Sequence, residues 1–343
     1  MNFDRVKKII SFVLKLAIAG AIVWYLLLRD TGMLVASLRN FDVRYLIAGA
    51  VFYGCHLIVC SWRWRKLARI LNIELGRMES FNLTMQGIFF SLVIPGGAVG
   101  GDVVKMAVIS KRTPDGSRIE GAFTVLMDRI IGMIALFMLV LGIIPFSLDL
   151  LMNCSIPQIN ITPGVKKLII LAFVLLSFAG LGASCVIFMH RIIHKVPLFD
   201  RILNFADRIT HGMVSRMEQA ADVYSRKPGE LAMLTAVSVF GVHLLTAVPV
   251  LCLLAGLGIK FSVFSVITAV TLGNVAGLIP LFPSGLGGRD LVTVTILAAS
   301  GIAVGDAKSV QLLCTAVIIV FNLLGGLFFI FDPGRKKKST FQE

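Results

Sequence analysis

Two short stretches of this sequence share one pattern: PGGAVGGD at residues 95–102 and PSGLGGRD at residues 283–290. Both read P-x-G-x-x-G-x-D, and they are 188 positions apart. Proline removes a backbone donor and glycine tolerates unusual dihedral angles, so each pattern predicts a helix that breaks inside an apolar stretch. The residues that define the two breaks are Pro95, Gly97, Gly100, Pro283, Gly285 and Gly288.

The similarity between the two stretches extends upstream of the breaks. Gln86 and Asn274 stand at the same offset of 188, and Gly-x-His-Leu recurs at His56 and His243 at an offset of 187. With the break pattern these are three matches in order at a nearly constant offset, which is not a chance result of a glycine-rich chain. We therefore predict two internal repeats, at about residues 43–146 and 231–331, joined by a linker at about 191–230.

The composition places the chain in a lipid bilayer. Of 343 residues, 57% are hydrophobic and 15% charged, and the mean hydropathy is +0.89, which leaves too little polar surface for a soluble domain. A spanning helix needs about 20 mostly apolar residues. Six runs reach that length: Ile9–Leu28, Val43–Ser61, Ile119–Phe146, Val165–His190, Leu231–Leu257 and Val310–Phe331.

The two broken stretches, Phe81–Ile109 and Ser262–Val304, consist of shorter arms. Each is typical of a re-entrant hairpin or of a pair of short spans. We therefore expect an all-α integral membrane protein in which residues 1–343 form a single polytopic domain. It would have six full transmembrane helices and two such hairpins.

Positive charge predicts the orientation in the membrane. Lys and Arg gather at residues 63–77, 105–118, 191–227 and 335–338, whereas residues 147–164 contain neither type. Because Lys and Arg collect in cytoplasmic loops, we expect a protein of the cytoplasmic (inner) membrane with both termini in the cytoplasm. The two breaks then enter from opposite faces, as in an inverted-topology repeat.

The linker between the repeats predicts a basic amphipathic helix. Apolar residues recur at helical spacing through residues 197–227, with arginines on the other faces. Such a helix can lie in the cytoplasmic headgroup region or pack on the protein's own loops. Trp62 and Trp64, interleaved with Arg63 and Arg65, are typical of an interfacial anchor.

The polar residues inside the apolar runs are the candidate functional residues. Asp128 and Arg129 lie within a predicted span, where ionisable groups are costly and are usually paired or functional. They are adjacent and face different directions, so each needs a partner elsewhere, and Asp102, Lys105, Arg289 and Asp290 are available. Asp102 and Asp290 fall where a second half-helix begins, so they either cap those helices or contact a substrate or proton. The full set of predicted translocation residues is Asp102, Lys105, Asp128, Arg129, Arg289, Asp290, Gln86 and Asn274.

Broken helices in membrane proteins suit an anionic ligand. The freed backbone groups need protein or water around them, which requires a polar cavity. The amides at the start of the second half-helix carry partial positive charge, which favours a phosphate or carboxylate. His56 and His243 are weaker candidates, because a lone buried histidine is more often a packing residue. The sequence indicates no metal site, cofactor or nucleic-acid module, and it contains no nucleotide-binding motif.

In its order of motifs the chain resembles the lysylphosphatidylglycerol synthase transmembrane family. The motifs are Arg63-Trp64 with Leu67, the first break through Asp102 and Lys105, Asp128-Arg129 with Gly132, and the second break through Asp290. The family includes flippase-like proteins and the membrane half of multiple-peptide-resistance factors. Two mild departures are Asp290, where Glu is frequent, and Ser284, where Gly is common. In bifunctional members aminoacyl transfer belongs to a separate soluble domain, for which we expect no room after the last span.

The leading hypothesis is a flippase-like protein that moves an anionic or phosphate-bearing lipid, such as a phospholipid, an aminoacyl-phospholipid or a polyprenyl-linked lipid. Its partners would be membrane lipids, and a homo-oligomer is compatible with the sequence. One alternative is a membrane-embedded transferase that uses a lipid carrier. The other is an accessory subunit of lipid or envelope synthesis with no transport of its own. The sequence therefore leaves enzymatic activity open and favours a non-enzyme.

Overall fold

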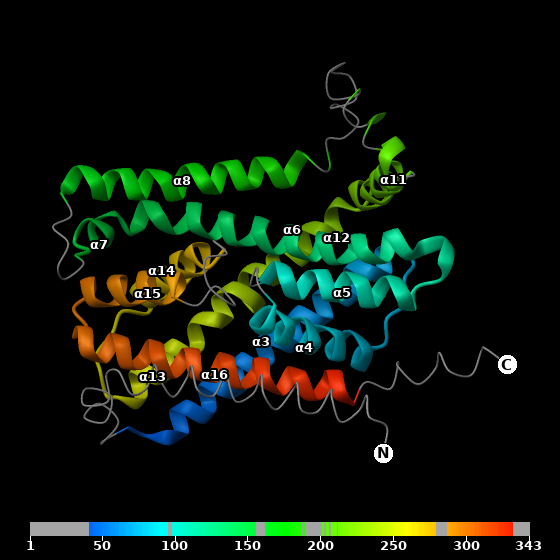
Figure 1. Cartoon of the computed structure of the whole chain (residues 1–343). Coiled ribbons are helices and arrows are strands. Elements are labelled where there is room, and N and C mark those ends of the chain that lie inside the picture. Colours follow the sequence, from blue (N-terminus) through cyan, green and yellow to red (C-terminus); the bar gives the residue numbers. More distant parts are fainter. Residues whose placement is uncertain are drawn as a thin grey trace.

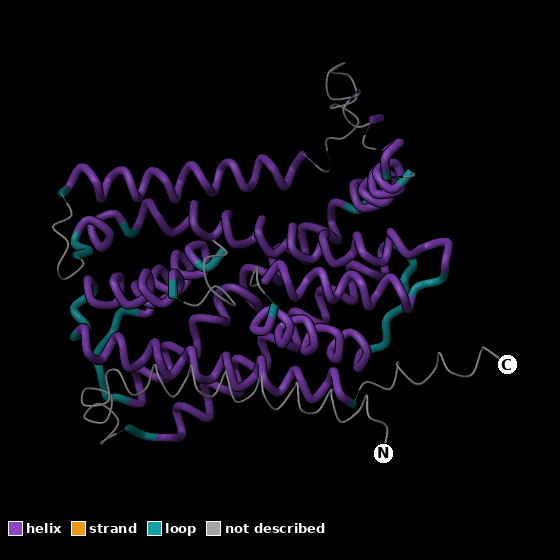
Figure 2. Tube along the Cα trace, viewed as in Figure 1, coloured by secondary structure: helices purple, strands orange, loops and turns teal. Residues whose placement is uncertain are grey.

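The computed structural model of the chain describes residues 41–94, 98–155, 162–186, 188, 201, 204–205, 207–210, 212–278 and 287–331. Over these ranges the protein is helical and contains no strand (Figure 2). The helices in chain order are α3 (Val43–Ile70), α4 (Arg77–Val93), α5 (Ala98–Arg112), η1 (Asp115–Ser117), α6 (Arg118–Ile143), η2 (Ile144–Phe146), α7 (Leu148–Met152), α8 (Pro163–Val186), α11 (Met213–Ser225), α12 (Pro228–Val237), η4 (Ser238–Leu244), η5 (Leu245–Ala247), α13 (Val248–Gly256), α14 (Val263–Ala276), α15 (Gly288–Ala299) and α16 (Val304–Ile330).

Five helical stretches of the described part are long and apolar enough to cross a membrane. They are Val43–Ile70, Arg118–Phe146, Pro163–Val186, Pro228–Gly256 and Val304–Ile330. Each contains or overlaps one of the six predicted full spans, and the sixth, Ile9–Leu28, lies outside the described residues. The chain is therefore a multi-pass helical membrane protein.

The outer face of α8 illustrates why a bilayer must surround the bundle. Leu168, Leu175 and Phe178 are 64%, 58% and 59% exposed, respectively. Only a small part of α8 is buried by the rest of the protein, although the helix is strongly apolar. A continuous apolar surface of this kind would not be stable in water, so lipid chains must cover it.

Two packed helix pairs, α4 with α5 and α14 with α15, consist of helices that are shorter than a bilayer is thick. α4 and α5 have 17 and 15 residues, and α14 and α15 have 14 and 12. At 1.5 Å per residue these helices reach roughly 18–26 Å, against a hydrocarbon core of about 30 Å. α4 packs against α5 and α14 against α15, and the two pairs lie toward opposite ends of the bundle (Figure 1).

The order of helices repeats along the chain. Displaced by 188 positions, the first residues of α3, α4, α5 and α6 fall within three residues of the first residues of α12, α14, α15 and α16. The contacts between the halves are reciprocal as well, because α4 packs on α16 while α14 packs on α6, and α3 packs on α13. Each half thus completes its packing with a helix from the other half.

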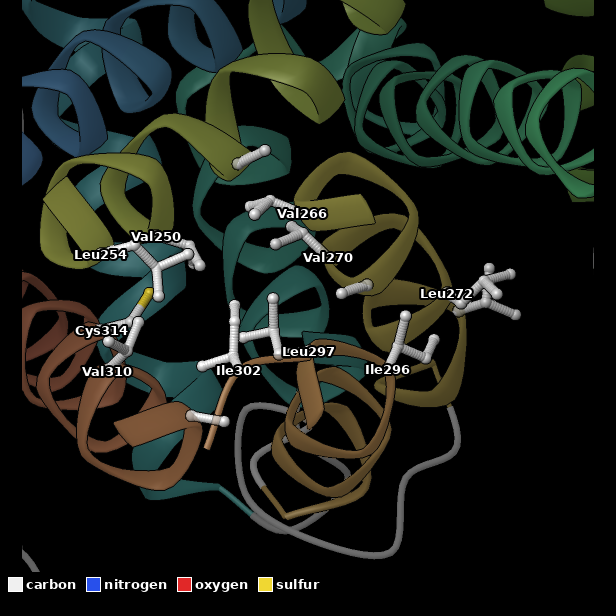
Figure 3. Close-up of a cluster of buried hydrophobic side chains, with 14 of the residues drawn as sticks. Val250, Leu254, Val266, Val270, Leu272, Ile296, Leu297, Ile302, Val310 and Cys314 are labelled. Carbon is white, nitrogen blue, oxygen red and sulfur yellow. The ribbon is translucent and has the colours of Figure 1, made fainter. Parts of the chain in front are cut away.

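The largest apolar core joins the second half of the chain to α6. Its buried side chains come from α13, α14, α15 and α16, with Leu136, Phe137 and Val140 of α6 in the same cluster. In Figure 3, Val250 and Leu254 of α13 face Val310 and Cys314 of α16. A second cluster joins α3 and α6 to α11 and α12. The interior of the protein is therefore held by contacts between helices far apart in sequence.

Glycine allows the closest approach within each short helix pair. A Cβ atom on Gly101 of α5 would overlap the carbonyl oxygen of Gly87 on α4, and a Cβ on Gly273 of α14 would overlap the hydroxyl of Thr293 on α15. Small residues let helix backbones come together in membranes, and these two glycines do so within each pair.

Helix α3 runs further than the apolar run that predicts it. α3 continues from Ser61 to Ile70, which adds more than two turns and carries Trp64 into the interior. The expectation that Trp64 anchors the chain at the membrane interface is therefore wrong, because its ring is fully buried and its Nε1 donates to Thr124 Oγ1 at 3.0 Å. Trp62 remains half-buried.

The described part of the linker packs on the protein itself. α11 buries Ala220, Ala221 and Tyr224 against α3 and α6, and the Tyr224 hydroxyl donates to the Leu67 carbonyl oxygen at 2.9 Å. Burial raises the pKa of Tyr224 well above its ordinary value, so this hydroxyl stays a donor. For residues 213–225 the second of the two linker hypotheses, packing on the protein, describes the observed contacts.

Candidate functional site

A polar cavity of about 270 Å³ lies mainly among helices of the first half of the chain and is bordered by Val242, His243 and Leu278 of the second half. Its walls come from α3, α4, α5, α6 and the η4 segment. Its polar lining residues are Tyr53, His56, Cys60, Arg63, Thr84, Ser91, Asp102, Lys105, Asp128, Arg129 and His243. Four of the six predicted ionisable residues therefore line one cavity: Asp102, Lys105, Asp128 and Arg129.

Asp128 of α6 is held by two cations. Arg63 Nε donates to Asp128 Oδ1 at 2.8 Å, and Lys105 Nζ lies 4.0 Å from Oδ2. The side chains of Arg63 and Lys105 are only 6% and 7% exposed, so these charges need partners inside the protein. Arg63 also donates to Ser238 Oγ at 2.9 Å and to the Asp128 carbonyl oxygen at 3.1 Å.

Lys105 has an aromatic neighbour in addition to the carboxylate. Its Nζ lies 3.7 Å from the centroid of the Trp64 ring, a position in which the ring face stabilises the ammonium group. The ammonium is thus held on one side by the ring and reaches Asp128 only at the limit of an ion pair. Of the cavity's cations it is the one least closely bound to a carboxylate.

Arg129 pairs with the carboxylate of the first break. Its Nε donates to Asp102 Oδ2 at 2.7 Å, and its Nη2 contacts the same oxygen. Adjacent residues Asp128 and Arg129 thus do face different partners, as expected. Asp102 is the fifth residue of α5, which has no acidic residue in its first turn. The prediction that Asp102 lies in the first turn is therefore wrong, because the helix begins at Ala98.

His56 and His243, the two histidines of the recurring Gly-x-His-Leu string, both line this cavity. His243 Nε2 lies 2.8 Å from the Gly132 carbonyl oxygen, and His56 Nε2 lies 3.7 Å from Cys60 Sγ. His243 stands in η4, a π-helical segment from Ser238 to Leu244. Such segments are uncommon and are frequently found at functional sites. Here η4 supplies both His243 and the Ser238 hydroxyl that binds Arg63.

Arg289 and Asp290 form a second polar cluster with α16. The Arg289 guanidinium donates to Asp290 Oδ1 at 2.9 Å and to Thr315 Oγ1 at 3.0 Å, and Gln311 Nε2 donates to the same carboxylate oxygen at 2.8 Å. Asp290 also accepts from the Gly287 amide at 3.4 Å, which caps α15. Its predicted position in the first turn is confirmed.

The two motif carboxylates share one kind of contact. Asp102 is bound by a residue of α6, and Asp290 by residues of α16, the helix that corresponds to α6 at the offset of 188. Each half of the chain therefore ties its short second arm to its own following long helix. The structure thus brings the predicted ionisable residues together in two clusters instead of one.

The remaining predicted residues contact neighbouring helices outside the two ionic clusters. Gln86 is buried and donates to the Phe328 carbonyl oxygen at 3.4 Å, and Asn274 donates to Thr246 Oγ1 at 3.3 Å. Gly100 is buried in α5. Gly288 is the first residue of α15, and a Cβ atom on it would lie in close contact with the Ala276 carbonyl oxygen, at 3.3 Å. Four motif residues, Pro95, Gly97, Pro283 and Gly285, lie outside the described residues.

Sequence reasoning missed Arg63, Gln311 and Thr315 as site residues. Arg63 belongs to a Trp-Arg-Trp-Arg string that is typical of an interface, and the two polar residues of α16 are small features of an apolar helix. For Arg63 the helical spacing could have shown that it faces inward, because Leu57, Ser61, Trp64 and Ala68 form one buried stripe beside it.

The fold and the cavity define a multi-pass helical membrane protein with a charged interior. The chain belongs to the family described as "Lysylphosphatidylglycerol synthase TM region", whose model matches residues 12–326. Family membership agrees with a lipid-related function in the membrane.

Two archaeal relatives cover most of the chain. A UPF0104 membrane protein of Pyrococcus horikoshii is 20% identical over 328 residues, which cover 94% of this chain and 97% of the relative. A UPF0104 membrane protein of Methanothermobacter thermautotrophicus is 22% identical over 286 residues, which cover 81% of this chain and 82% of the relative. No solved structure matches the chain.

Proposed function

We propose that this protein translocates a phosphate-bearing lipid across the cytoplasmic membrane by passing its headgroup through the polar cavity. The observation that carries the proposal is the cavity's charge. Among its described lining residues are three cations, Arg63, Lys105 and Arg129, and two carboxylates, Asp102 and Asp128. Leaving the histidines aside, the lining has one positive charge in excess, which favours an anion.

The size of the cavity supports a polar headgroup as the ligand. Its volume is about 270 Å³, whereas a water molecule occupies about 30 Å³ of the liquid. A phosphodiester with several waters of hydration fits this space. The acyl chains do not need to enter the cavity, because they can stay in the bilayer and lie against apolar outer surfaces of the kind seen on α8.

The ion pairs provide a way to bind and release the phosphate. Arginine binds phosphate oxygens as well as carboxylate oxygens, with two parallel hydrogen bonds. An entering phosphate can take over Arg129 from Asp102 and approach the Lys105 ammonium, and the carboxylates can take the cations back when it leaves. Exchange between two sets of anions avoids leaving a buried charge unpaired.

The arrangement of the helices supports an inverted-topology repeat. In this proposal α4–α5 and α14–α15 are re-entrant hairpins that enter from opposite faces, and repeats 43–146 and 231–331 are related by a two-fold axis in the membrane plane. Their short helices, their positions at opposite ends of the bundle (Figure 1) and the reciprocal packing of α4 on α16 and α14 on α6 are its support. Transporters of this kind place substrates between the repeats.

The charge distribution supports the proposed orientation, with both termini in the cytoplasm. The end of the bundle near α11 carries Arg69, Arg77, Lys111 and Arg112, and Lys and Arg mark the cytoplasmic side. The cavity then lies nearer the cytoplasmic hairpin. The Arg289–Asp290 cluster would belong to the other hairpin, and in this scheme it is a second binding site for the headgroup.

Reconstitution into liposomes tests the proposal. Vesicles with fluorescent, headgroup-labelled phosphatidylglycerol would be compared with and without the protein, and the rate at which label becomes accessible to an external quencher would be measured. Lys105→Ala removes a cavity cation. Lys111→Ala, on the exposed last turn of the same helix, is the matched control.

We expect the wild type and Lys111→Ala to accelerate movement of the labelled lipid and Lys105→Ala to be slow. Equal rates in all protein-containing vesicles and in empty vesicles would contradict transport. Vesicles that are inert until a soluble donor is added, and then form a modified lipid, would favour a membrane-embedded transferase instead.

A further inference from the structure

A basic groove lies on the outer face of the bundle, between the second half of α3 and the start of α4. Its volume is about 710 Å³. Its lining residues are Ile58, Ser61, Trp62, Arg65, Lys66 and Arg69 of α3 and Arg77, Met78, Ser80 and Phe81 of α4. Within this described lining there are four cations and no carboxylate.

The groove is separate from the interior cavity. The two linings have no residue in common. Ser61 and Ser80, whose hydroxyl oxygens are 3.0 Å apart, join α3 to α4 at the bottom of the groove. Arg63, on another face of α3, is directed inward to Asp128. A ligand in the groove therefore contacts none of the residues that we assign to translocation.

The apolar part of the groove fits an acyl chain. Ile58 and Met78 are 57% and 68% exposed, and Phe81 lies beside them on α4. Trp62 is half-buried at the border between apolar and basic residues, with Lys66 Nζ 5.6 Å from the centroid of its ring. Tryptophan favours the level of the membrane where headgroups meet chains.

The basic part fits an anionic headgroup. Arg65 is fixed by a hydrogen bond from its Nε to the Leu75 carbonyl oxygen at 3.0 Å. The side chains of Arg69 and Arg77 are exposed and make no hydrogen bond or ion pair with any residue that the structure describes. Four cations around one groove repel each other, and an anion between them relieves that repulsion.

We propose that this groove holds a resident phospholipid with an anionic headgroup, bound from the leaflet at the basic end of the bundle. Its phosphate would lie among Arg65, Lys66, Arg69 and Arg77, and a chain would lie along Ile58, Met78 and Phe81. The lipid links α3 to α4 from outside. The proposal does not depend on transport, because the site is separate from the cavity.

Quenching of Trp62 fluorescence by brominated lipids tests this site. The full-length protein would be reconstituted in nanodiscs that contain phosphatidylcholine and a small fraction of phosphatidylglycerol or phosphatidylcholine with brominated chains. The chain has three tryptophans, so the signal of a Trp62→Phe variant is subtracted. A second series compares Arg69→Ala/Arg77→Ala with Lys111→Ala/Arg226→Ala, which removes two exposed cations outside the groove.

We expect brominated phosphatidylglycerol to quench Trp62 at far lower mole fractions than brominated phosphatidylcholine. Each cation near the membrane surface is worth on the order of a fivefold preference for an anionic lipid. Loss of Arg69 and Arg77 should therefore weaken the preference on the order of tenfold or more, and the control pair should leave it unchanged. Soluble glycerol phosphate should not compete, because it lacks chains.

Three results would overturn the proposal. Equal quenching by both headgroups would show a site for chains alone. Protection of Trp62 from both brominated lipids would show that another segment of this chain covers the groove. Competition by glycerol phosphate at low concentration would show a site for a free anion. If the double variant does not fold, the headgroup comparison in the wild type and its loss at high salt still decide the question.

Discussion

Replacing Asp128 by asparagine should destabilise the fold more than any similar change at an exposed carboxylate. Asp128→Asn keeps the size of the side chain and removes its charge. Arg63, at 2.8 Å, and Lys105, at 4.0 Å, would lose their anion while they remain 6% and 7% exposed. Breaking a buried ion pair by removing one partner costs about 3–5 kcal/mol. Arg63 keeps its bonds to Ser238 and to the backbone, so we expect the lower end of that range.

The free energy of unfolding can be measured in mixed micelles by titration with a denaturing detergent, with helical circular dichroism as the signal. Glu230→Gln is the matched control, because Glu230 and its partner Lys227 are 51% and 45% exposed. Exposed pairs contribute about 0–1 kcal/mol. The double variant Arg63→Gln/Asp128→Asn should cost less than the sum of the single changes, since contacting residues are coupled. Equal losses for Asp128→Asn and Glu230→Gln would refute the reasoning.

Two further predictions concern contacts between helices. Gly101→Ala should lower stability by about 1–3 kcal/mol, the usual cost of overpacking, because its methyl group would overlap the Gly87 carbonyl oxygen. Gly142→Ala is the control: nothing lies within 4 Å of the added atom, so this variant should be neutral or slightly stabilising in the same assay. Tyr224→Phe should cost about 0.5–1.5 kcal/mol and speed proteolysis of the α11 segment, because the buried bond to Leu67 is lost; an unchanged cleavage rate would mean that this bond does not hold α11 in place.

The long helices could be predicted from the sequence because a bilayer imposes a simple requirement. Val43, Ile119 and Val310 each begin runs of about the length that a membrane needs, and helices cover these runs. The exact ends could not be predicted. α3 continues to Ile70 because Trp64 and Leu67 find a buried surface on neighbouring helices, and that surface is a property of the folded bundle.

The candidate site could be predicted in its residue types but not in its pairing. Asp128 and Arg129 were recognisable as charges in an apolar span, and adjacency alone showed that each needs a separate partner. Which partner each takes depends on how α3 and α5 pack on α6. For this reason Arg63 was missed as the main partner of Asp128. Helical spacing can distinguish the arginines of α3 that face the interior from those that face outward, but only once the buried stripe of this helix is known.

The most direct test of the central claim is to locate a lipid headgroup in the cavity by photo-crosslinking. A phosphatidylglycerol analogue with a diazirine on its headgroup would be irradiated with the protein in a bilayer, and the modified residues would be mapped by mass spectrometry. The account predicts adducts at cavity residues such as Lys105 and Asp128, reduced by excess unlabelled phosphatidylglycerol. Adducts confined to lipid-facing residues of α8, such as Leu168 and Phe178, would contradict it.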